Sequence, residues 1–180
     1  MRIEKTNHLV TAVNLRKQNG ASLLEGIAYL GIAALVVLGA VSLLSSASSS
    51  AKANQMTNEV VALRTAVRKL YAGQGFTANV DLRPTLTSAR AVPSTLQTSG
   101  STITNSWNGS VTVSGTTTTT FTISYPNVPQ DVCVSVLSGA TDWTSVKGAG
   151  AAITAFPVSS ANAVATCSGT TNTVDLIANS

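Results

Sequence analysis

Few side chains in this sequence have the type and spacing for chemistry. The one histidine, His8, lies near the N-terminus, so the body of the chain cannot form a Ser-His-Asp or Cys-His arrangement. The acids after residue 72 are aspartates without close pairing in the sequence: Asp81, Asp131, Asp142 and Asp175. Neither a phosphate-binding loop of the Walker type nor a GxGxxG turn occurs. We therefore predict a protein that is not an enzyme and needs no metal or cofactor.

The chain has two cysteines, Cys133 and Cys167. Their spacing is neither CxxC nor that of a metal-ligand pair, and no histidine lies nearby. In an exported chain this pattern predicts one disulfide that closes a long loop, which would contribute about 3–4 kcal/mol of stability by loop-closure entropy. In a cytosolic chain the two would instead be buried free thiols.

One carboxylate, Glu25, precedes a long apolar run. Residues 26–44 carry no charge, while Arg16 and Lys17 stand before Gly20 on the other side of Glu25. An acid within a membrane helix costs about 2.5–3.5 kcal/mol on insertion scales, and a buried charge persists best when it is paired. Glu25 is therefore a candidate for pairing with a cation. Alternatively it lies at headgroup depth near a helix N-terminus, where the helix dipole favours an anion.

The apolar run has the length of a membrane span. A helix of about 20 residues rises ~30 Å, the thickness of a bilayer's hydrocarbon core. Arg16 and Lys17 predict a cytoplasmic N-terminus. Residues 1–20 hold most of the chain's excess positive charge, which is +4 overall, so the body lacks a basic stripe. Binding to nucleic acid is therefore not expected.

Residues 21–72 have a helical pattern. Residues 21–50 are apolar or small and predict a membrane-spanning half of a long helix, and residues 51–72 predict an amphipathic half. The expected buried stripe is Ala53, Met56, Val60, Leu63, Val67 and Leu70. Charged residues between them, Glu59 and Arg64 included, are assigned to the solvated face. The serines at 45–50 mark where this helix would bend or fray.

Residues 73–180 predict a β-rich head. The segment 73–106 is expected to be a connection with one short helix, because it contains prolines and shows little periodicity. Strand patterns follow in "SVTVSG", "TTTTFTISY" and "DVCVSVLSG", with weaker ones in "AAITAFPV", "NAVATCSG" and "NTVDLIANS". Trp107 and Trp143 are interpreted as anchors in the core or in loops. Short sequential strands after a long helix predict an α+β protein with an antiparallel sheet.

The stretch "NGASLLEGIAYLGIAAL" resembles the class III signal of type IV pilins and pseudopilins. Gly20 ends a basic leader, Glu25 is the fifth residue after it, and an apolar run follows. The twenty-residue leader and the alanine after it are similar to the type IVb group, which includes the toxin-coregulated and bundle-forming pilins and the thin pili of conjugative plasmids. The stretch "NSWNGSVTV…FTISYPNVPQDVC" is also similar to those pilins.

The resemblance implies how the protein would be processed and assembled. A membrane-embedded prepilin peptidase would remove residues 1–20 by cutting between Gly20 and Ala21, and would methylate the new amino group of Ala21. In the filament, that amine would meet Glu25 of a neighbour. Cys133 and Cys167 would bracket a region, 133–167, that shapes contacts between subunits. The precursor would lie in the inner membrane with its assembly machinery, and the product would be an extracellular homopolymer.

Other interpretations of the sequence remain open. A minor pilin or a pseudopilin of a secretion system would share the same N-terminal chemistry. Ala51 and Ala53 also form an A-x-A signal-peptide site, which would release a secreted binding module beginning near Asn54. A single-pass protein that keeps its leader is the third alternative.

Overall fold

The structure is a computed structural model that describes residues 22–180. The expected leader at 1–20, with the cleavage and methylation residues Gly20 and Ala21, lies outside the described residues. The chain divides into two compact units, one up to Ser42 and one from Leu43 to Ser180. Helix α1, Leu23–Leu70, contributes to both units, and each is described by itself below.

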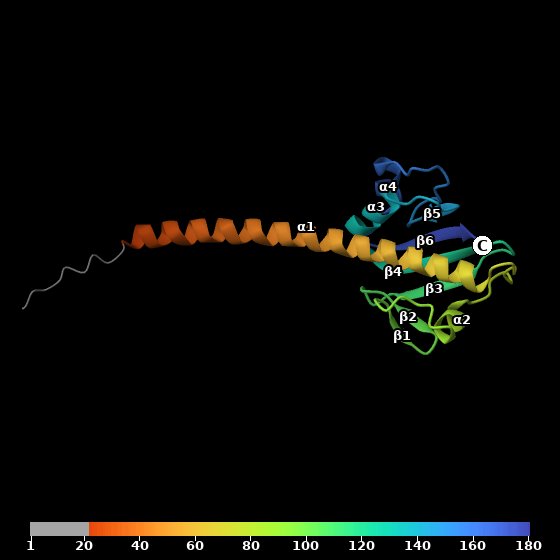
Figure 1. Cartoon of the computed structure of the whole chain (residues 1–180). Helices are drawn as coiled ribbons and strands as arrows, with labels where there is room; N and C mark the ends of the chain where they lie inside the picture. The colour runs from red at the N-terminus through yellow and green to blue at the C-terminus, as the bar shows by residue number, and fades with distance from the viewer. Residues whose placement is uncertain (1–21) are drawn as a thin grey trace, which may run out of the picture. The chain divides into compact units, whose positions relative to one another are not determined.

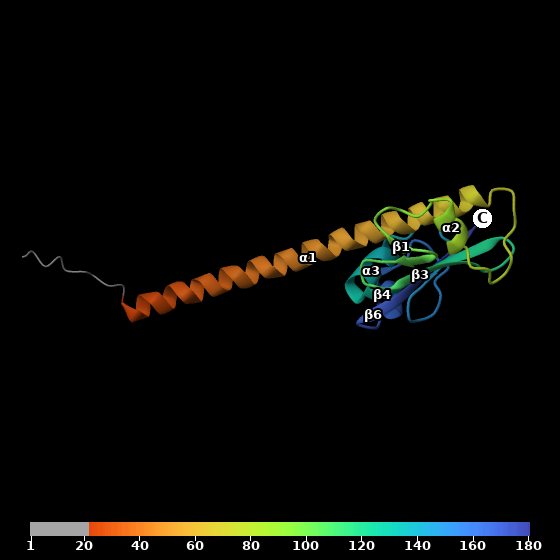
Figure 2. The same cartoon turned by 90° about the horizontal axis from the view of Figure 1, so that it is seen from below.

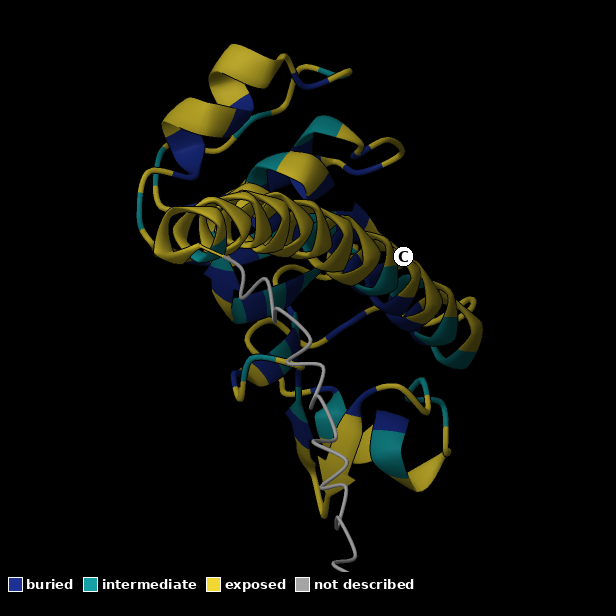
Figure 3. Ribbon diagram, turned by 90° about the vertical axis from the view of Figure 1, so that its left-hand side faces the viewer, coloured by how far each residue is buried: buried dark blue, intermediate teal, exposed yellow. Residues whose placement is uncertain are grey.

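The described part of the first unit is the N-terminal part of α1, and its apolar side chains are exposed. Leu23 is 86% and Leu30 is 72% exposed. Figure 3 colours this part of the helix mostly as exposed. The helix is long and apolar enough to cross a membrane, judged by length and composition alone. Exposed leucines at this density would be unfavourable in water, so this segment needs lipid or protein around it.

The second unit is built around a six-stranded antiparallel sheet with strand order β1-β2-β3-β4-β6-β5. The strands are β1 Gln97–Ser99, β2 Thr102–Thr104, β3 Ser110–Gly115, β4 Thr120–Pro129, β5 Ser145–Lys147 and β6 Thr171–Asn179. The helices are α2 Arg83–Ser88, α3 Gln130–Ser138 and α4 Ser160–Thr166, beside the C-terminal part of α1. Figures 1 and 2 show this part of α1 lying along the sheet. The expected class, α+β with a long helix packed on an antiparallel sheet, is confirmed.

The core lies between α1 and one face of the sheet. The strands alternate between buried and solvent-facing residues, as in β4, where Phe121, Ile123 and Tyr125 are buried. The expected helical stripe faces them, with Met56, Val60, Leu63 and Val67 at most 2% exposed. Burying each such side chain favours folding by about 1.5–3 kcal/mol. Leu70, the last residue of the expected stripe, is only half-buried.

Two of the expected strands are helices instead. "DVCVSVLSG" contributes most of α3, and "NAVATCSG" contributes α4. In α3 the buried residues are Val132, Cys133, Val136 and Leu137, whose spacing is that of a helix face rather than a strand. The hydroxyl of Ser159 accepts a hydrogen bond from the N–H of Asn162 at 3.3 Å and caps α4. Of "AAITAFPV", only Ile153 makes a bridge to a strand.

The expected connection at 73–106 contains more structure than a loop. Its one short helix is α2, which carries Pro84 in its first turn. The hairpin of β1 and β2 was not expected, because both strands have three residues and consist mostly of Ser, Thr and Gln. Such short polar strands have little burial pattern to detect.

Candidate functional site

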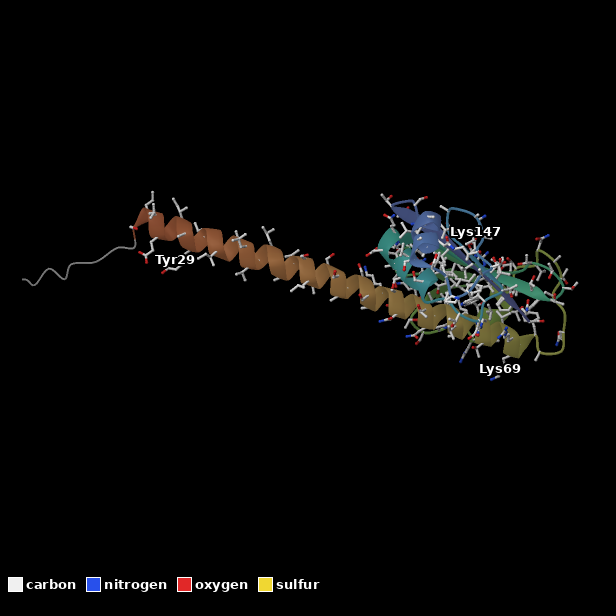
Figure 4. The ribbon with its side chains drawn as sticks, turned by 90° about the horizontal axis from the view of Figure 1, so that it is seen from above. Tyr29, Lys69 and Lys147 are labelled. Carbon is white, nitrogen blue, oxygen red and sulfur yellow. A yellow bond between two sulfur atoms is a disulfide. The ribbon has the colours of Figure 1, made fainter. Side chains whose placement is uncertain are left out.

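The carboxylate singled out by the sequence, Glu25, lies in the first turn of α1. The hydroxyl of Ser22 accepts a hydrogen bond from the N–H of Glu25 at 3.3 Å, in the manner of an N-cap. Tyr29, one turn further on, donates its hydroxyl to Oε1 of Glu25 at 3.4 Å, and Figure 4 labels Tyr29 at this end of the helix. The helix N-terminus itself favours an anion at this place.

Glu25 has no cation partner within residues 22–180, where the one ion pair joins Arg83 to Asp81 at 2.9 Å. Its neighbours Leu24 and Ile27 are apolar and exposed by 80% and 63%. Anything that covers these side chains will also take the carboxylate out of water. A covered carboxylate then requires a positive partner, since an unpaired buried charge is expensive.

The two cysteines form the disulfide Cys133–Cys167, with a Cα–Cα distance of 6.0 Å. The bond joins α3 to the C-terminal end of α4. At the start of α3, a hydrogen bond from Ser49 of α1 is the main cause that lowers the pKa of Asp131, and the nearby Lys52 lowers it further. The disulfide therefore closes the loop 133–167, and Asp131, two residues before that loop, is held close to α1.

A buried carboxylate, Glu59, was wrongly assigned to the solvated face of α1. Glu59 is only 3% exposed. The amide of Gln55 donates to its Oε1 at 2.8 Å, and the hydroxyl of Tyr125 donates to its Oε2 at 3.1 Å. Burial, and then the charge of Glu59 and this hydrogen bond, raise the pKa of Tyr125. Its position three residues after Met56 and four before Leu63 could have revealed that Glu59 falls on the buried stripe.

Two arginines of α1 donate hydrogen bonds to backbone carbonyls of the head. Arg64 donates to the backbone carbonyl of Asp142 at 2.7 Å, and its guanidinium carbon lies 4.9 Å from the ring centre of Trp143. Arg68 donates to the carbonyl of Asn179 at 2.9 Å. Trp143 is thus a buried anchor, as interpreted from the sequence, and Trp107 is partly buried against the core. None of these contacts brings catalytic groups together, and the described residues hold no cluster of potential metal ligands.

Comparisons with known proteins show which family this chain resembles. A family model described as PilS N terminal matches residues 50–179. Among solved structures, the crystal structure of a type IVb pilin from Salmonella typhi is similar, with 26% sequence identity and a TM-score of 0.55. The match covers 71% of this chain and 99% of that one. A search of curated proteins found no match.

Proposed function

This chain belongs to the PilS family of type IVb pilins, and from that premise we propose that it is a prepilin that is cut between Gly20 and Ala21 and polymerises as the major subunit of a pilus. The observation that carries the proposal is the exposed carboxylate of Glu25 among exposed apolar side chains of α1. The exposed apolar side chains are unfavourable in an isolated soluble subunit, and the carboxylate becomes costly once they are covered. They become favourable if the helix passes from lipid into a bundle of identical helices.

Cleavage supplies the missing cation in this proposal. Removing residues 1–20 creates an α-amine on Ala21, four residues before Glu25, and methylation leaves that amine able to carry a proton. In the membrane the amine lies near Glu25 of its own helix. In a growing filament the amine of an incoming subunit pairs with Glu25 of its neighbour and so fixes the axial register. An uncut leader blocks the amine and keeps the subunit in the bilayer.

The proposal assigns a role to each segment. Residues 21–50 span the membrane and then form the filament core, residues 51–72 anchor the head, and residues 73–180 are the exposed head. The region 133–167 shapes contacts between subunits. The precursor has a cytoplasmic N-terminus in the inner membrane, and its partners are the prepilin peptidase, the assembly machinery and further copies of itself. As a structural subunit it catalyses no reaction.

The first test is the N-terminal sequence and intact mass of the protein from cells that contain their native peptidase. A start at Ala21, with or without the mass of one added methyl group, is the expected result. A start near Asn54 would mean a secreted head released by a signal peptidase, and an intact Met1 would mean a plain membrane anchor. Either of these would overturn the prepilin proposal.

The second test separates a major from a minor subunit. Surface fibres are sheared from cells and their proteins are quantified. A major pilin dominates that fraction, because the filament consists mostly of it. Traces of this chain among a more abundant pilin would show a minor subunit, and its absence from sheared fibres would favour a pseudopilin.

A further inference from the structure

The sheet of the second unit continues past β5 by a single residue. Val146 and Ile153 form an antiparallel bridge in which each N–H donates to the other's carbonyl, at 3.0 Å and 2.7 Å. In such a pair the neighbouring residues direct their backbone groups to the opposite side. The N–H and C=O groups of Ala152 and Thr154 therefore face outward. No hydrogen bond joins them to any other group in residues 22–180.

Residues 151–155, which include this edge, line one side of a groove. The groove has a volume of about 380 Å³ and lies between residues 151–155 and helix α4, which contributes Asn162, Ala165 and Thr166. In Figure 1, α4 lies close to β5 in this part of the head, and Lys147 in Figure 4 marks the end of β5. The groove is therefore bounded by a strand edge on one side and a helix on the other.

The walls of the groove are fixed against each other at one end. Gly148 donates its N–H to Oγ1 of Thr166 at 3.2 Å, and Ala149 donates to the Thr166 carbonyl at 2.7 Å. The hydroxyl of Thr166 in turn donates to the carbonyl of Ala151 at 3.4 Å. The disulfide at the next residue, Cys167, ties this end of α4 to α3. The outward backbone groups therefore belong to a segment that is already held in place. Little conformational entropy of this segment would be lost when a ligand binds to it.

We propose that this groove binds an extended, uncharged peptide segment of another protein, which adds as a further strand to the edge at Ala152–Thr154. Main-chain hydrogen bonds to a free strand edge are the basis of this mode of recognition. The lining carries no charged side chain and half of its residues are alanines, so small uncharged side chains fit it best.

The proposal stands independently of filament assembly, because it uses only the head. Its test measures binding of a fluorescent peptide to the full chain in detergent, by polarisation. The probe is an uncharged peptide of about seven residues, the length of a typical strand, with alternating alanine and valine and blocked ends. A second probe has the same side chains but methylated backbone nitrogens, so that it cannot donate hydrogen bonds.

The protein variants are a matched pair on α4. Ala165→Leu places a larger side chain in the groove, whereas Ala161→Leu makes the same change at an exposed position of the same helix outside the groove. We expect the wild type and A161L to bind the first probe equally, and A165L to bind it at least about tenfold more weakly. The methylated probe should not bind to any of them.

Three results would overturn the proposal. The first is no binding of the unmethylated probe to the wild type at millimolar concentration. The second is equal binding by A165L and A161L, which would place the peptide elsewhere. The third is equal binding of the methylated probe, which would show that backbone hydrogen bonds to the edge are not used.

Discussion

Two glutamates of the same helix have opposite surroundings. Glu25 lies exposed near the helix N-terminus with a long hydrogen bond from Tyr29, while Glu59 is buried under Tyr125. Glu59 is satisfied by hydrogen bonds within the head, so its role is complete in one chain. Glu25 has only a solvent-exposed tyrosine for a partner in residues 22–180. The difference indicates that Glu59 serves the fold, and it fits the proposal that Glu25 pairs with a group of another molecule.

Removing the Tyr125 hydroxyl tests the role of Glu59. Tyr125→Phe leaves Oε2 of Glu59 buried without its donor, so we expect a loss of about 1–3 kcal/mol in the free energy of unfolding. Tyr71→Phe is the matched control, because the Tyr71 ring packs on Phe76 at 5.1 Å and its hydroxyl makes no hydrogen bond within the described chain. Urea unfolding followed by tryptophan fluorescence measures both. Equal stability of the two variants would contradict this role.

The raised pKa of Tyr125 predicts a dependence on alkaline pH. The neutral hydroxyl is the form that the fold stabilises, so this contribution is complete below the unfolded pKa of about 10 and is lost as the pH rises above it. One tyrosine should therefore ionise only as the head unfolds. Tyrosinate absorbance and tryptophan fluorescence, recorded together during a titration, measure this. A wild-type curve identical to that of Tyr125→Phe, apart from amplitude, would argue against it.

At the scale of elements, the loop after β5 depends on its close approach to α4. A Cβ at Gly148 would lie impossibly near the carbonyl oxygen of Thr166, whereas a Cβ at Gly139 would have its nearest neighbour at 3.5 Å, an ordinary contact. We expect Gly148→Ala to destabilise the head by about 1–3 kcal/mol, as overpacking does, and Gly139→Ala to have little effect. The same urea experiment compares them. Similar stability of both variants would show that the loop is free to move away from α4.

Sequence patterns located elements where burial alternates strictly. The strands β3, β4 and β6 were predicted because each places buried residues at every second position, in β4 as far as Tyr125. The helices α3 and α4 were missed because both are short and consist mostly of β-branched and small residues, which favour strands or loops. Contacts with neighbouring elements, rather than local sequence signals, determine where they begin and end. The partners of Glu59 and the groove beside α4 arise from segments far apart in the chain, which no local pattern records.

The candidate site that the sequence indicated is the N-terminal part of α1, and its role stays a prediction. Its signal is local, since charge, small residues and apolar length all lie within one short stretch. What the sequence could not supply is a partner for Glu25, because the contact that we propose for it would lie between molecules. At the scale of the whole molecule, the test must therefore be made in the assembled fibre.

Glu25→Ala is the variant that tests assembly. The uncharged helix still suits the bilayer, so we expect membrane insertion and cleavage after Gly20 to stay largely intact, while the amine of an incoming subunit finds no anion in its neighbour. Sheared fibres from cells that express only this variant should be absent or sharply reduced. The mass of the membrane-bound protein, measured in the same cells, shows whether processing occurred.

The matched control is Tyr29→Phe, which removes the hydroxyl that donates to Glu25 and leaves the carboxylate in place. If the carboxylate acts by pairing with an amine of another subunit, Tyr29→Phe should form nearly normal fibres. If Glu25 only stabilises the start of α1 through the helix dipole, the loss in Glu25→Ala should be small, because such an interaction contributes about 0.3–1 kcal/mol. Normal pili on Glu25→Ala cells would therefore exclude the pairing role and leave the dipole interaction as its explanation.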